Sequence, residues 1–143
     1  MGTQMSSAKR SIATDEMIQV AKDEELDIEY IMKNVARGSV IIPKNTERKQ
    51  TIKVVGIGKG LKTKVNVNIG TSTLYQNIEE EISKAKVATK YGADTIMDLS
   101  DGGDLNYIRE KLLDAASILT FGSVPIYQAY GYGVEKYKNP LNI

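Results

Sequence analysis

The sequence of 143 residues contains no cysteine and no histidine. Without cysteine, the chain itself can form no disulfide, offers no thiol nucleophile and cannot hold an iron–sulfur cluster through thiolates. Without histidine, it lacks the side chain that most often acts as a general base or binds a metal ion. Chemistry carried by these residues alone therefore depends on carboxylates, lysine, tyrosine, hydroxyls or side-chain amides.

A strong net charge and a long apolar run are also missing. The formal net charge is +1, which gives no electrostatic reason to expect nucleic acid or an anionic membrane as a partner. No apolar run approaches the length of a membrane span, and the first residues lack the apolar segment of a signal peptide. We therefore expect a cytoplasmic protein with no nucleic-acid and no membrane partner.

What is present is typical of a globular domain. Hydrophobic residues make up 41% of the chain and charged residues 26%, which are ordinary shares for a protein with a packed core. The length allows one domain with such a core and is too short for two large ones.

Two helices are predicted near the N-terminus. Thr14 is placed to cap a helix over residues 15–24, and Asp27 to cap a second one that ends before Gly38. A short strand over residues 40–42 and a polar linker follow. We assign residues 1–50 to a helical lead-in with a short strand and linker, and residues 51–143 to the main domain.

Two helices joined by a tight turn also fit a helix-turn-helix motif. The polar face of the second helix carries Glu29, Lys33 and Asn34, and this mixture of charges is poorly suited to binding phosphates. A lead-in packed on the main domain is the simpler interpretation.

A glycine- and lysine-rich stretch occupies residues 56–70, after a possible short strand at residues 52–55. It does not match a P-loop, because Leu61 separates Gly60 from the following lysine. The dinucleotide fingerprint fails as well, since these glycines precede a strand and not a helix. A flexible turn with solvated lysines is the simpler interpretation.

Strands and helices alternate from this point onward. Strands are predicted at residues 65–68, 95–99 and 123–127, and the last of these contains Pro125, which we place near its start. Asn77, with Glu80 three residues later, forms a capping box for one intervening helix, and Asp104 can cap the other.

This order predicts an α/β fold with a parallel sheet built by right-handed crossovers. The expected strand ends at Asn68, Met97 and Tyr127 lie 29 and 30 residues apart. A (β/α)8 barrel spends about 31 residues on each unit, although flavodoxin-like folds use similar lengths. We expect the opening βα units of a TIM-like barrel that is incomplete in this chain.

Polar side chains gather at the carboxyl ends of these strands, where parallel α/β folds bind ligands. Asn68, Asp98 and Ser100 are the candidates, although each alone is more often a cap or a turn residue. Met97 is more often a core residue than a ligand contact. The turn at residues 101–104 either faces a phosphate or simply caps a helix, and its two carboxylates disfavour phosphate.

Three sequence segments are more specific than the spacing of the predicted strands. They are Val-Asn-Val-Asn-Ile-Gly-Thr-Ser (residues 65–72), Tyr-Gly-Ala-Asp-Thr-Ile-Met-Asp-Leu-Ser (91–100) and Gly-Ser-Val-Pro-Ile-Tyr-Gln-Ala (122–129). In this order they resemble the phosphomethylpyrimidine synthase family of thiamine biosynthesis. The resemblance also takes in the lead-in, from Thr-Asp-Glu-Met (14–17) to Ile-Pro (42–43), and so covers nearly the whole chain.

The resemblance implies a radical S-adenosylmethionine lyase with a (β/α)8 barrel, usually a homodimer. Such enzymes convert 5-aminoimidazole ribonucleotide into 4-amino-5-hydroxymethyl-2-methylpyrimidine phosphate. The family's first three substrate contacts fall here on Asn68, Met97 and Tyr127. They imply an amide that hydrogen-bonds the ribonucleotide, a thioether packed on its imidazole and a hydroxyl on a polar substrate atom. No catalytic, cofactor-binding or metal-binding residue carries over.

The departures from the family pattern are large. The intact family uses S-adenosylmethionine, a 4Fe–4S cluster held by three cysteines, and a divalent metal such as zinc held by histidines, and this chain has neither residue type. We therefore expect an N-terminal fragment that is inactive alone. The alternative is a non-catalytic nucleotide- or phosphate-binding α/β module that uses the glycine stretch and the turn at residues 100–104.

Overall fold

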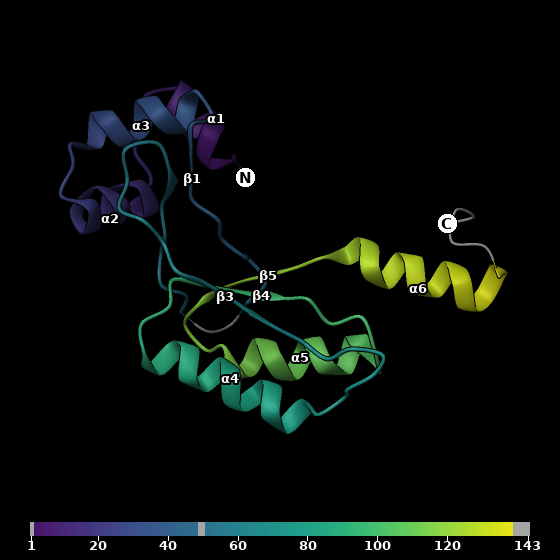
Figure 1. Cartoon of the computed structure of the whole chain (residues 1–143). Coiled ribbons are helices and arrows are strands. Elements are labelled where there is room, and N and C mark those ends of the chain that lie inside the picture. The colour runs from purple at the N-terminus through teal and green to yellow at the C-terminus, as the bar shows by residue number, and fades with distance from the viewer. Residues whose placement is uncertain (1, 49–50, 139–143) are drawn as a thin grey trace. The chain divides into compact units, whose positions relative to one another are not determined.

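The computed structural model describes residues 2–48 and 51–138. The chain forms two compact units, Met1–Lys64 and Val65–Ile143 (Figure 1). The division predicted between residues 50 and 51 from the sequence stays a prediction, and residues 49–50 on its N-terminal side lie outside the described part.

Three helices and a two-stranded sheet form the first unit. The helices are α1 (Gln4–Lys9), α2 (Asp15–Glu24) and α3 (Ile28–Ala36), and the strands β1 (Val40–Ile41) and β2 (Ile57–Gly58) pair antiparallel. Apolar residues of α2, α3 and β1, with Ala8 of α1, form its core, in which Met17, Ile31 and Val40 are almost fully buried.

The two helices predicted in this unit are confirmed. Thr14 Oγ1 accepts a hydrogen bond from the Met17 N–H at 3.3 Å and so caps α2. Asp27 is the N-cap residue of α3 but makes no side-chain cap hydrogen bond. Gly38 has a φ of +74°, which suits the residue that follows a helix C-cap. The short helix α1 was not predicted, because its six residues show no clear apolar period.

The glycine stretch differs from its prediction in two ways. Residues 52–55 form no strand; instead β2 lies within the glycine stretch and pairs Gly58 with Val40. This pairing needs glycine at position 58, because glycine has no Cβ and a Cβ there would lie only 2.2 Å from the Ser39 carbonyl oxygen. The lysines are not all solvated, because Lys64 Nζ lies 2.7 Å from the buried Glu24 carboxylate.

The second unit confirms the alternation of strands and helices. Its elements are β3 (Asn66–Ile69), α4 (Ile78–Lys90), β4 (Thr95–Asp98), α5 (Leu105–Ala115), β5 (Thr120–Ser123) and α6 (Pro125–Tyr137). The strands form a parallel sheet in the order β3-β4-β5. Within the described residues this sheet has three strands and does not close into a barrel.

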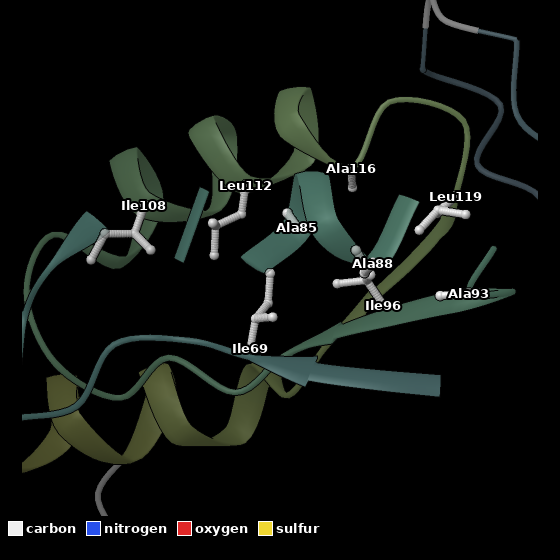
Figure 2. Close-up of a cluster of buried hydrophobic side chains, with 9 residues drawn as sticks. All are labelled: Ile69, Ala85, Ala88, Ala93, Ile96, Ile108, Leu112, Ala116 and Leu119. Carbon is white, nitrogen blue, oxygen red and sulfur yellow. The ribbon is translucent and has the colours of Figure 1, made fainter. Parts of the chain in front are cut away.

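Helices α4 and α5 begin where the caps predicted. Asn77 Oδ1 accepts from the Glu80 N–H at 3.2 Å, and Asp104 Oδ1 accepts from the Tyr107 N–H at 3.1 Å. Both helices pack on one face of the sheet. Figure 2 shows Ile69 and Ile96 of the strands meeting Ala85, Ile108 and Leu112 of the helices.

The third strand is where the sequence prediction was wrong. It covers Thr120–Ser123 instead of residues 123–127, and Pro125 and Tyr127 belong to α6. Proline suits the first turn of a helix, since its φ is already helical and its missing N–H would have no partner in the helix. Tyr127 therefore lies in the first turn of a helix and not at a strand end.

Candidate functional site

The face of the sheet opposite α4 and α5 carries two rows of side chains. Because successive residues of a strand point to opposite faces, the residues that alternate with buried Ile69 and Ile96 line this second face. One row contains Asn66, Thr95 and Thr120, and the row nearer the carboxyl edge contains Asn68, Met97 and Gly122.

Asn68 and Met97 are direct register partners on β3 and β4. The structure thus brings together two of the three residues that the sequence singled out. The Asn68 side chain is exposed, and its Oδ1 accepts a hydrogen bond from Asn66 Nδ2 at 2.8 Å. Asn66 Oδ1 in turn accepts from the Thr95 hydroxyl at 2.7 Å. These polar groups are aligned along the face and available to a ligand with hydrogen-bonding edges.

Gly122 completes the row and was not predicted as a site residue. A Cβ at this position would lie 3.0 Å from Met97 Cε and 3.2 Å from its Sδ. The Met97 thioether therefore rests against the backbone of β5, in space that a larger residue would occupy. The sequence missed it because Gly122 lay just before the strand predicted over residues 123–127; within the observed β5, a glycine in a strand marks such a close approach.

Tyr127 lies in different surroundings from Asn68 and Met97. Its side chain is about half exposed and lines a cavity of about 370 Å³ between α6 and the loops that follow β3 and β4. The cavity wall includes Thr73, Asp101, Tyr130 and Glu135. Tyr127 thus faces this cavity and the two loops from the first turn of α6.

The loops after β3 and β4 are hydrogen-bonded to each other at the carboxyl edge. The buried Thr71 donates its N–H to Ser100 Oγ at 3.1 Å and its hydroxyl to the Gly102 carbonyl at 2.7 Å. A Cβ on Gly102 would lie 2.5 Å from Ser72 backbone atoms. Glycine at this position therefore allows the two backbones to approach this closely, and the loop after β4 serves as a structural contact.

Helix α4 anchors the end of β3 through a buried carboxylate. Glu81 Oε2 accepts from the Gly70 N–H at 2.7 Å, and its Oε1 lies 2.7 Å from Lys84 Nζ. The sequence showed Glu81 only as one of three acidic residues in a first turn. Its contact with the strand end two residues after Asn68 depends on the packing of α4 against the sheet.

Two of the three lysines of the glycine stretch, Lys62 and Lys64, are engaged within the first unit. Lys62 N–H donates to Glu24 Oε2 at 2.6 Å, and Lys62 Nζ lies 3.2 Å from Glu25 Oε1. Burial raises the pKa of Glu24, but hydrogen bonds from Lys64 and the Lys62 N–H outweigh this effect and leave the pKa below its ordinary value. Because Lys62 and Lys64 already face carboxylates, the phosphate-binding module is not favoured.

The residues of this chain do not fit the metal groups that the resemblance implies. An iron–sulfur cluster needs thiolates, and the sequence has no cysteine. Zinc sites are built mainly from cysteine, histidine and carboxylates, and no group of three such side chains that could hold a metal ion occurs among residues 2–48 and 51–138. We therefore assign no cluster or metal ligand to this chain. In the same part of the chain, no helix combines the length and apolarity needed to cross a membrane.

Comparison with known proteins identifies relatives along nearly the whole chain. The sequence model of the Radical SAM ThiC family matches residues 3–143. The phosphomethylpyrimidine synthase of Methanocaldococcus jannaschii is 52% identical over 141 residues, which are 99% of this chain and 32% of the relative. The phosphomethylpyrimidine synthase of Pyrococcus furiosus is 51% identical over 127 residues, 89% of this chain and 29% of the relative.

A third relative matches this chain with similar identity and coverage. A phosphomethylpyrimidine synthase of Thermus thermophilus is 48% identical over 127 residues, again 89% of this chain and 29% of the relative. The chain thus spans about a third or less of the length of the curated relatives it matches. With a family match that extends over residues 3–143, the chain belongs to the radical SAM ThiC family.

Proposed function

We propose that this chain supplies part of the substrate site of a phosphomethylpyrimidine synthase. The reaction is the radical conversion of 5-aminoimidazole ribonucleotide into 4-amino-5-hydroxymethyl-2-methylpyrimidine phosphate for thiamine biosynthesis. The observation that carries the proposal is the register pair of Asn68 and Met97 at the carboxyl edge of a parallel sheet, in a chain of this family.

The proposed fold of the complete protein is a (β/α)8 barrel to which residues 51–143 contribute the first units. Three parallel strands in sequential order, with α4 and α5 on one face, support this proposal. A cavity of about 510 Å³ lies along β3 and the flank of α4, with Val65, Val67 and Val87 in its wall. A further strand and helix would cover these apolar groups.

Within this site, the chain's own residues bind and orient the substrate. The Asn68 amide hydrogen-bonds the ribonucleotide, Met97 packs against the imidazole, and Tyr127 offers its hydroxyl from the first turn of α6. The row of Asn66 and Thr95 behind Asn68 holds the orientation of its amide. These are positioning roles, and no proton-transfer step is assigned to them.

The groups that initiate the radical reaction are held outside this chain. S-adenosylmethionine and a 4Fe–4S cluster supply one-electron chemistry in such enzymes. Because this chain lacks cysteine and histidine, the cluster and a divalent metal such as zinc require residues from another segment. We propose a homodimer in the cytoplasm as the form of the complete enzyme, and predict that the present chain is inactive alone.

A chimera tests this function. The chain replaces the segment that it matches in the Methanocaldococcus jannaschii relative, and formation of the pyrimidine phosphate is measured with the ribonucleotide as substrate. We expect an active chimera in which Asn68→Ala weakens ribonucleotide binding about three- to tenfold, which corresponds to one lost hydrogen bond. Cluster content should stay the same, since Asn68 is assigned no part in holding the cluster.

The matched control is Asn45→Ala, which removes the same side chain from an exposed position of the first unit. A folded chimera with a full cluster and no activity would overturn the proposed function. If Asn68→Ala and Asn45→Ala bind the ribonucleotide equally well, Asn68 is not part of the substrate site. Tight binding of ATP by the 143-residue chain, unaffected by Asn68→Ala, would favour the nucleotide-binding alternative.

A further inference from the structure

Helix α6 buries little of its own surface. Ile126, Tyr130 and Val134 are all exposed, and within the described helix only Gly133 is buried. Apolar burial therefore contributes little to holding α6 against the rest of the unit. The orientation of the helix, and with it that of Tyr127, must depend on more specific contacts.

Gln128, the neighbour of Tyr127, provides such contacts at both ends of its amide. Its Oε1 accepts a hydrogen bond from Arg109 Nη1 at 3.0 Å, and its Nε2 donates to Asn106 Oδ1 at 2.9 Å. Both partners belong to α5. A side chain held by a donor and an acceptor at once has a defined rotamer, so the first turn of α6 is tied to α5.

Arg109 extends this link to the sheet. Its Nε lies 3.7 Å from Asp98 Oδ2, and the Asp98 side chain is only 1% exposed. Asp98 Oδ1 accepts the Ser100 N–H at 2.9 Å, which fixes the carboxylate in place. Asp98 directly follows Met97 at the carboxyl end of β4. The Arg109 guanidinium therefore contacts both Asp98, which follows Met97 in the sequence, and Gln128, which follows Tyr127.

We propose that Arg109 and Gln128 are positioning residues that fix the position of the Tyr127 side chain relative to Met97. Together with Asp98 they form a set of contacts that we call the latch (Asp98, Arg109 and Gln128). The latch deepens the proposed function and rests on it for the substrate role of Tyr127. Its geometry favours arginine, because Nη1 donates to Gln128 while Nε of the same planar group lies at ion-pair distance from Asp98 without a hydrogen bond. A lysine has a single nitrogen, which cannot both donate to Gln128 and keep a second nitrogen beside Asp98.

The latch is tested by a distance measurement in the complete 143-residue chain. Because the chain has no cysteine, the pair Glu110→Cys and Lys136→Cys provides unique sites for spin labels on α5 and α6. Double electron–electron resonance spectroscopy then gives the distribution of distances between the two spin labels. We expect a narrow distribution in the parent chain and a clearly broader one in Gln128→Ala and in Arg109→Lys.

Two further variants distinguish loss of the contacts that position α6 from a general loss of structure. Gln128→Glu keeps an acceptor for Arg109, and the Asn106 amide can turn to donate to it, so this variant should restore the narrow distribution. Gln19→Ala removes the same side chain type from α2, where Gln19 bonds only to Asp23 within its own helix in the hydrogen bonds described, and should leave the distribution unchanged. Equal widths in Gln128→Ala and the parent chain would overturn the latch.

A second readout connects the latch to the substrate. In the chimera, Gln128→Ala should raise KM for the ribonucleotide about three- to tenfold with a smaller change in kcat, since a misplaced Tyr127 loses one substrate hydrogen bond. Gln128→Glu should return KM to the parent value. A broadened distance distribution with unchanged KM would overturn the substrate role of Tyr127, whereas an inactive but folded chimera would overturn the proposed function itself.

Discussion

The Met97 thioether lies against the backbone of Gly122, with Cε only 3.0 Å from the place that a Cβ would take. This contact joins two neighbouring strands on the face of the sheet that carries Asn68. The size of residue 122 thus sets how deeply Met97 rests on β5. Any side chain larger than a hydrogen atom at this position must move the thioether.

Gly122→Ala should displace the Met97 side chain while leaving the fold intact. The methyl group would meet the flexible end of methionine, so we expect a loss in unfolding free energy of less than about 1.5 kcal/mol. The methyl resonance of Met97, assigned in a chain labelled at its five methionines, should shift strongly. Gly131→Ala is the control, because a Cβ there meets nothing within 4 Å; an unshifted Met97 resonance in Gly122→Ala would contradict the contact.

Gly70→Ala should destabilise the second unit by at least about 2 kcal/mol. Gly70 has a φ of +141°, and a Cβ would lie 2.5 Å from the Ser100 N, so strain and a backbone clash add together. Urea unfolding gives the free energy. Gly92→Ala isolates the strain, since Gly92 has a φ of +80° with open space around it, and should cost only about 1 kcal/mol. Similar losses in both variants would mean that the two loops separate without penalty.

Leu112→Ala should lower the unfolding free energy by about 2–5 kcal/mol, because it opens a cavity between α5 and the sheet. Leu112 is fully buried in the cluster of Figure 2. Ile118→Ala removes a comparable side chain that is 48% exposed and should cost less than about 1 kcal/mol. The ranking in denaturant titration is the measurement, and a reversed ranking would show that the core is not formed as described.

Acid should weaken the first unit through Glu16. Hydrogen bonds from Lys44 and Gln4 lower the pKa of Glu16 from 4.5 to about 2. A carboxyl group whose pKa is lower in the folded state stabilises the fold above its unfolded pKa, and this contribution disappears as the pH falls through the folded pKa. The stabilisation is therefore complete above about pH 4.5 and is lost on the way to pH 2.

The measurement compares parent and Glu16→Gln by chemical unfolding between pH 7 and pH 2. The difference in unfolding free energy should be largest above pH 4.5 and shrink below it. In a Lys44→Met background the pH-dependent part should become smaller, because the first of the two donors is missing. A difference that is the same at every pH would exclude this ion pair as its source.

Local signals in the sequence were sufficient for several elements. Thr14, Asn77 and Asp104 marked the beginnings of α2, α4 and α5, because a helix start needs an acceptor for its free N–H groups and these side chains supply one locally. The alternation of valine and asparagine over residues 65–68 located β3, and the compact apolar run over residues 95–99 located β4. The pairing of Asn68 with Met97 followed from the placement of parallel strand ends at one edge.

Other features depended on residues far apart in the chain. The amino-acid sequence by itself determined the capped helices, the first two parallel strands and the resemblance to a family, since each rests on neighbouring residues. Only the tertiary structure decided that Tyr127 lies on a helix, that Glu81 holds the Gly70 backbone and that Arg109 faces both Asp98 and Gln128. The reason is physical: a buried carboxylate or a guanidinium takes whatever partner packing brings within hydrogen-bonding distance, and no local pattern encodes that partner.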